Sequence, residues 1–187
     1  MKQFTLCALL VLALATGCDD DDMINPIAQI GRADGWQLSA ISSDMETNVN
    51  AALEALTDAE IDADPRSREV LEAEYADRVS TTTVIDDCDR DDAFFFVATG
   101  IMRLILQGET CPADGDPHPL STYNDRTFSV NSDASEITIR SGGGEFLDRF
   151  SILEITANTF SFGGQRTIGD SIFTDLTYQI RYDLIAQ

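Results

Sequence analysis

The chain almost lacks lysine: among its 187 residues the only one is Lys2. Lysine and arginine together number 12 against 33 aspartates and glutamates, which gives a formal net charge of −21. Nucleic-acid binding needs a basic surface, so this composition argues against a nucleic-acid partner. It also argues against a protein that lies flat on anionic lipid. Two interpretations of the charge stay open: adaptation to a saline habitat, where counterions screen the repulsion, or simply an acidic surface.

Histidine is equally scarce, and this limits the available chemistry. His118 is the only one, and it lies between Pro117 and Pro119. A Ser-His-Asp triad would have to use it, and no Gly-x-Ser-x-Gly elbow accompanies it. A zinc site would need further histidine or cysteine ligands. Paired carboxylates are abundant through composition alone, so we expect a non-enzymatic protein without a cofactor or a bound metal.

The first residues have the pattern of an export signal. Lys2 precedes the apolar run from Phe4 to Ala15, and the small residues 15–17 lead to Cys18. A charged start, a short apolar stretch and small residues at the cut are typical of a secretory signal peptide. The cysteine at the cut resembles a bacterial lipoprotein signal, which implies cleavage before Cys18 and acylation (palmitate) on its thiol. An ordinary signal peptide with a cysteine there by chance is the alternative.

Removal of residues 1–17 leaves 170 residues, enough for one domain with a hydrophobic core, and shifts the net charge to −22 through the loss of Lys2. Residues 18–29, with the acidic run Asp19–Asp22, are expected to form a flexible tether. Cys88 and Cys111 are the only cysteines outside the signal and the lipidation position. In an oxidising compartment they are expected to form a disulfide, with two free thiols as the alternative.

The remaining residues, 30–187, read as one mostly β domain with a helical insertion. Trp36, Leu38 and Ala40 alternate with polar residues, which predicts the first strand. The segment 44–79 carries apolar residues at three- and four-residue spacing and predicts helix, with Asp64 as the N-cap of a second helix. Strand-like runs separated by turn clusters then follow at 93–98, 101–107, 123–130, 136–140, 146–155, 159–162 and 172–184. This spacing predicts an antiparallel barrel or strongly curved sheet of about eight strands.

This order of features resembles the lipocalin-like domain of exported lipoproteins of Gram-negative bacteria. The matching segments are Trp36-Gln-Leu-Ser-Ala-Ile41, Cys88, Asp91-Asp-Ala-Phe-Phe-Phe96 with Gly100, Cys111, and Phe150–Thr156 leading to Phe160-Ser-Phe162. The resemblance implies an up-and-down barrel, an outer-membrane location through the lipid on Cys18, and a small apolar ligand or a surface protein as partner. The acidic run after Cys18 resembles the signal that sends lipoproteins to the cell surface. The arginine that this family stacks on its tryptophan has no evident counterpart, because Arg181 falls on the polar face of the last strand.

Five aromatic residues are the candidates for lining a ligand-binding lumen: Trp36, Phe94, Phe96, Tyr178 and Tyr182. Aromatic residues at period two also form ordinary core, and a barrel filled by its own side chains would be a structural or interaction module without a ligand. The loop Asp87–Asp92 offers carboxylates for calcium. It departs from an EF-hand at the glycine and glutamate positions, so a solvated loop next to the disulfide is the preferred interpretation.

Overall fold

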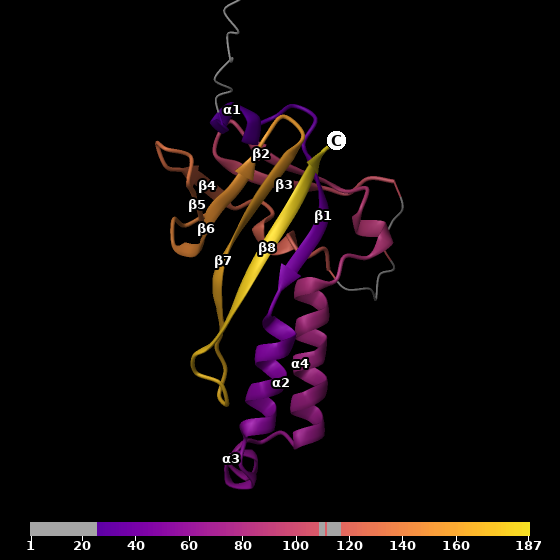
Figure 1. Ribbon diagram of the computed structural model, residues 1–187, viewed down its shortest axis with the longest axis vertical. Coiled ribbons are helices and arrows are strands. Elements are labelled where there is room, and N and C mark those ends of the chain that lie inside the picture. Colours follow the sequence, from indigo (N-terminus) through magenta and orange to yellow (C-terminus); the bar gives the residue numbers. More distant parts are fainter. Residues whose placement is uncertain (1–25, 109–110, 112–116) are drawn as a thin grey trace, which may run out of the picture.

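Eight antiparallel strands close into an up-and-down barrel in the computed structural model, which describes residues 26–108, 111 and 117–187. Each strand pairs with its neighbours in the chain and the last pairs with the first, so the predicted fold class is confirmed (Figure 1). The strands are β1 (Trp36–Ser43), β2 (Ala93–Val97), β3 (Ile101–Ile105), β4 (Thr127–Val130), β5 (Glu136–Arg140), β6 (Phe146–Ile155), β7 (Thr159–Ile168) and β8 (Leu176–Ala186).

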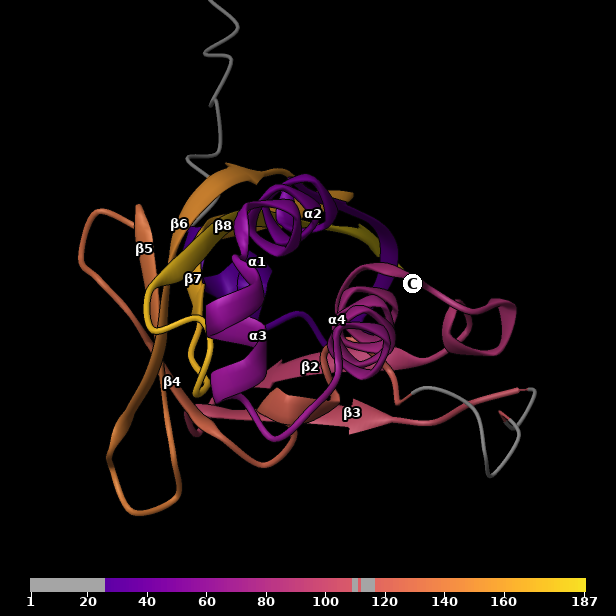
Figure 2. The same cartoon turned by 90° about the horizontal axis from the view of Figure 1, so that it is seen from below.

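Three helices between β1 and β2 form the predicted insertion: α2 (Met45–Ala55), α3 (Asp58–Ala63) and α4 (Arg68–Thr83). They extend away from one end of the barrel, which we call the helix end (Figures 1 and 2). The apolar stripe of α2 is buried as its spacing predicted, through Met45, Val49 and Leu53.

The predicted start of the second helix is wrong. Helix α4 begins at Arg68, and its N-cap is Ser67, whose hydroxyl accepts a hydrogen bond from the N–H of Val70 at 3.4 Å. Asp64 instead ends α3, and its carboxylate accepts a 2.8 Å hydrogen bond from the Arg66 guanidinium. Both Asp64 and Ser67 are good capping residues, and the extra helix α3 decides between them.

The opposite end of the barrel carries the short helix α1 (Pro26–Ile30) (Figure 1). Residues 26–29 of the predicted tether are therefore helical. The rest of the tether, the signal segment and Cys18 lie outside the described residues. Two 3-10 turns, η1 (Asp87–Asp89) and η2 (Ser121–Tyr123), complete the fold, and Tyr123 therefore precedes β4 instead of starting it.

Strand β7 is longer than predicted, because its glycine pair does not end it. Gly163 pairs with Arg181 of β8, and a Cβ atom at this position would lie 2.4 Å from the carbonyl oxygen of Ile180. Only glycine permits this close approach of two backbones. Strand β8 follows the predicted alternation, with Tyr178, Ile180 and Tyr182 buried and the residues between them exposed.

The β2–β3 hairpin is joined to the barrel by few strand pairs. One residue pair connects β1 to β2 and one connects β3 to β4, whereas ten pairs connect β7 to β8. The disulfide between Cys88 and Cys111, with Cα atoms 5.2 Å apart, ties the two chain segments that flank the hairpin. The predicted disulfide is confirmed, and the hairpin pairs Val97 with Ile101 and Ala93 with Ile105. Among the described residues, no helix has the length and apolarity needed to cross a membrane.

Candidate functional site

The five aromatic residues predicted to line a lumen all lie in the buried core. The Trp36 and Phe160 rings are 5.6 Å apart, and Phe96 packs edge-on against Phe160 at 5.4 Å. Further rings of Phe150, Phe162 and Tyr182 continue the cluster. These contacts are those of a packed aromatic core. Among the described residues, these aromatic side chains therefore occupy the centre of the barrel.

The partner of the tryptophan is an arginine that the sequence pattern did not identify. The Arg32 guanidinium carbon lies 5.0 Å from the Trp36 ring centroid, within cation–π range. The indole N–H donates to the carbonyl of Ile30 at 2.9 Å, and Arg32 donates to the carbonyl of Ala157 at 2.9 Å. Arg181 instead bonds to Asp183 on the outer face. The segment that follows α1 therefore closes its end of the barrel and supplies the stacking cation from sequence just before β1.

An apolar groove, which we call the α1 groove, lies beside this closed end. Its volume is about 520 Å³, within the range of small-molecule sites. Its walls come from α1, the tip of the β2–β3 hairpin and β4, and none of the lining residues is charged: Ile27, Ala28, Gly31, Phe96, Val97, Ala98, Gly100, Phe128, Ser129 and Val130. One predicted ligand-binding residue, Phe96, lines it. In a chain with a net charge of −21, an uncharged hollow of this size is a distinctive surface feature.

A second hollow, the mouth pocket, opens at the helix end and has the opposite character. Its volume is about 250 Å³, and it is lined by Thr81, Thr82, Pro117, His118, Pro119, Ser121, Thr122, Arg166 and Tyr182. Tyr182 is the predicted ligand-binding residue found here. The described residues of these two pockets include neither Trp36, Phe94 nor Tyr178.

A charged pair lies next to the mouth pocket. Arg166 Nη2 is 3.0 Å from Asp148 Oδ2, which also accepts a 2.8 Å hydrogen bond from the Tyr123 hydroxyl. Both charged side chains are mostly buried, and the pair is supported by this additional hydrogen bond. Burial raises the pKa of Tyr182 to about 12, against the opposing effect of Arg166, so the hydroxyl keeps its proton. Sequence reasoning missed this cluster. The available signal was the two-residue alternation of β7, which places Arg166 on the same face as the buried Phe160 and Phe162.

His118 is buried at the edge of the mouth pocket and is held as a neutral imidazole. Its Nδ1 accepts a 3.0 Å hydrogen bond from the N–H of Leu120, which places the proton on Nε2. Burial lowers the pKa of His118 to about 4, and nearby Asp92 opposes that shift. The side chain shapes the loop that carries η2; it does not resemble an activated base.

The acidic loop beside the disulfide gives no preformed calcium cage among the described residues. Asp87 is exposed and pairs with Arg90, whereas Asp92 is buried and accepts from the N–H of Gln107 at 2.8 Å. The one described group of three converging ligand atoms comprises Cys88, Asp89 and Cys111, within 4.8 Å. Both of its sulfur atoms belong to the disulfide, so this group offers a single carboxylate.

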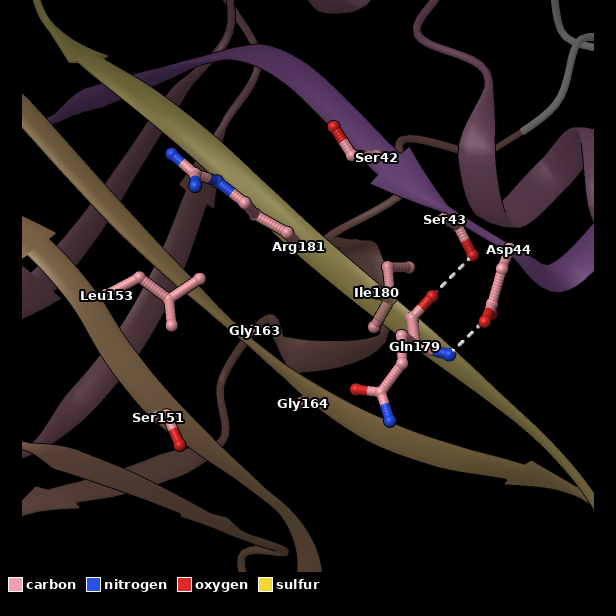
Figure 3. Close-up of a pocket in the computed structure, with 10 residues that line it drawn as sticks. All are labelled: Ser42, Ser43, Asp44, Ser151, Leu153, Gly163, Gly164, Gln179, Ile180 and Arg181. Atoms are coloured by element: carbon pink, nitrogen blue, oxygen red, sulfur yellow. Dashed lines mark hydrogen bonds between the residues drawn. The ribbon is translucent and has the colours of Figure 1, made fainter.

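A third hollow, of about 530 Å³, lies on the outer face of the barrel (Figure 3). Its floor is Gly163 and Gly164, and Leu153 and Arg181 flank it from the neighbouring strands. At its edge, the backbone carbonyl of Gln179 accepts a hydrogen bond from the Ser43 hydroxyl, and the backbone N–H of Gln179 donates to the Asp44 carboxylate, both at 2.7 Å. These bonds hold the start of α2 against β8. The hollow therefore contains charged side chains, Asp44 and Arg181, and its polar groups stabilise the fold.

Comparison of the chain with protein-family models, with curated proteins and with solved structures found no match.

Proposed function

We propose that this protein is an exported, non-enzymatic lipoprotein with a lipocalin-like barrel, anchored in the outer membrane by a lipid on Cys18 and exposed at the cell surface. We further propose that it binds a small apolar ligand in the α1 groove. The observation that carries this proposal is the uncharged lining of that groove in an otherwise highly acidic protein.

The position of the groove supports the link to a membrane. Cys18 and Pro26 are eight residues apart, so an extended tether spans at most about 29 Å. A lipid on Cys18 would therefore hold the α1 end of the barrel close to the bilayer. Apolar compounds partition into bilayers, so the groove would be near their source.

The anchor is tested by Cys18→Ser and cell fractionation. We expect the wild type to stay with membranes after a carbonate wash and the variant to leave them or to remain uncleaved. Retention of the cleaved variant on membranes would contradict the anchor. Replacement of Asp19–Asp22 by alanine is expected to keep the anchor and to abolish cleavage by externally added protease.

The groove is tested separately by titration of the neutral dye Nile red into Cys18→Ser protein. Mass spectrometry first verifies that the signal segment has been cleaved from this protein. Ala28→Glu places a charge in the groove from an exposed helical position, and Ala51→Glu is the matched control on α2. We expect about a tenfold loss of dye affinity for Ala28→Glu alone, because a bound apolar ligand would remove water from the new carboxylate without replacing its hydrogen bonds. Equal dye binding by the two variants would exclude the groove.

The packed lumen favours a second candidate function, an interaction module whose barrel holds no ligand and serves as a rigid support. This candidate predicts no Nile red binding by the wild-type barrel. The same titration therefore separates the two functions.

A further inference from the structure

We propose that the mouth pocket is a second binding site, for a neutral polyhydroxylated molecule of about the size of one sugar ring. This site is independent of the α1 groove, because it lies at the helix end of the barrel and shares no lining residue with it.

The hydrogen-bonding groups of the pocket include both donors and acceptors. Arg166 contributes guanidinium N–H groups, and Tyr182 a hydroxyl. The hydroxyls of Thr81 and Thr82 both donate to the carbonyl of Arg78, at 3.2 and 2.7 Å. Because each hydroxyl uses its hydrogen in this bond, its oxygen atom can act only as an acceptor toward a ligand. A ligand hydroxyl both donates and accepts, so it matches this mixture.

The charges of the pocket exclude the other ligand classes. Asp148 already neutralises Arg166 at 3.0 Å, so an anion would gain little there and would also face the oxygen lone pairs of Thr81 and Thr82. A cation would meet the Arg166 guanidinium and would find the Nδ1 of His118 occupied by the Leu120 N–H. An apolar ligand would displace water from the remaining guanidinium N–H groups and the threonine oxygen atoms without replacing its hydrogen bonds, which is costly. A neutral polar ligand meets none of these penalties.

The site is also held in place before any ligand arrives. Arg166 is fixed by Asp148 of β6, which is itself fixed by the hydroxyl of the buried Tyr123 of η2 at 2.8 Å. Groups that are ordered in advance lose less conformational entropy on binding. The volume of about 250 Å³ is below the usual range for drug-sized ligands and fits one small ring.

Saturation-transfer NMR tests this proposal on the mature protein in a detergent without a sugar headgroup. The probes are glucose, galactose and mannose, with glucuronate and glucosamine as charged analogues of the same ring. We expect saturation transfer to at least one neutral hexose and weaker transfer to both charged analogues. The absence of transfer to all three hexoses, or preferential binding of a charged analogue, would overturn the proposal.

Two valine substitutions on α4 locate the site. Thr82→Val removes an acceptor from the pocket, whereas Thr83→Val removes an equivalent hydroxyl that bonds to Val79 and does not line it. We expect about a fivefold loss of hexose affinity for Thr82→Val, as for one lost hydrogen bond, and less than twofold for Thr83→Val. Equal effects would show that the hexose binds elsewhere. Ala28→Glu is expected to leave hexose binding unchanged, so failure of the α1 groove and failure of the mouth pocket are distinguishable.

Discussion

Acid lability through His118 is the sharpest prediction for the stability of this barrel. The imidazole is 5% exposed and its Nδ1 accepts the Leu120 N–H, a bond that protonation of Nδ1 would abolish. Burial lowers its pKa from 6.5 to about 4 in the folded chain. The unfolded chain therefore binds a proton at a higher pH than the folded chain, and folding loses stability as the pH falls below about 6.5.

The size of the effect follows from the two pKa values. Between pH 7 and pH 5 the unfolded state gains a proton that the folded state does not, which costs about 2 kcal/mol of unfolding free energy. Asp92 acts in the opposite direction, because burial raises its pKa and its protonation relieves a buried charge. A variant that removes only the imidazole is therefore needed to separate the two contributions.

His118→Asn is that variant. An asparagine side-chain oxygen accepts from the N–H two residues later in an Asx turn, so it replaces the bond to Leu120 without titrating. Urea unfolding of both proteins at pH 7 and pH 5 measures the difference. We expect the wild type to lose about 2 kcal/mol more than the variant over this interval. Parallel pH dependence of the two proteins would refute the buried, neutral imidazole.

Three further predictions follow from the backbone, the disulfide and the charge. Gly163→Ala places a Cβ atom 2.4 Å from the Ile180 carbonyl oxygen, and we expect a loss of about 1–3 kcal/mol in urea unfolding. The control Gly142→Ala, where a Cβ atom meets nothing within 4 Å, is expected to lose almost none, and equal stabilities of the two variants would contradict the close approach. Reduction of the Cys88–Cys111 disulfide, which joins residues 23 apart, is expected to lower the free energy of unfolding by about 3 kcal/mol. Both cysteines should resist alkylation until a reductant is added, and ready labelling without a reductant would refute the bridge. The melting temperature is expected to rise from low salt to molar NaCl or KCl, because screening weakens the repulsion among 33 carboxylates, and a flat or falling curve would remove the halophilic interpretation.

The strands and the barrel were predictable because their signals are local. Alternation in β8 places Tyr178, Ile180 and Tyr182 on one side whatever surrounds them, and turn-rich segments separate the strands. The disulfide was predictable from cysteine number, and the helical insertion from its spacing. The start of α4 was not, because Asp64 and Ser67 have similar capping chemistry and Asp64 is used to end the extra helix α3.

The sequence by itself determined the fold class and the buried face of β8, because a two-residue period and short turns act over neighbouring residues. Only the tertiary structure decided where the polar groups meet. Asp148, Arg166 and Tyr123 come from β6, β7 and η2, and they converge because the barrel closes around them. Arg32 covers Trp36 because α1 folds back over the barrel end. Such contacts between distant side chains depend on the angles between elements, which no local pattern of residues specifies.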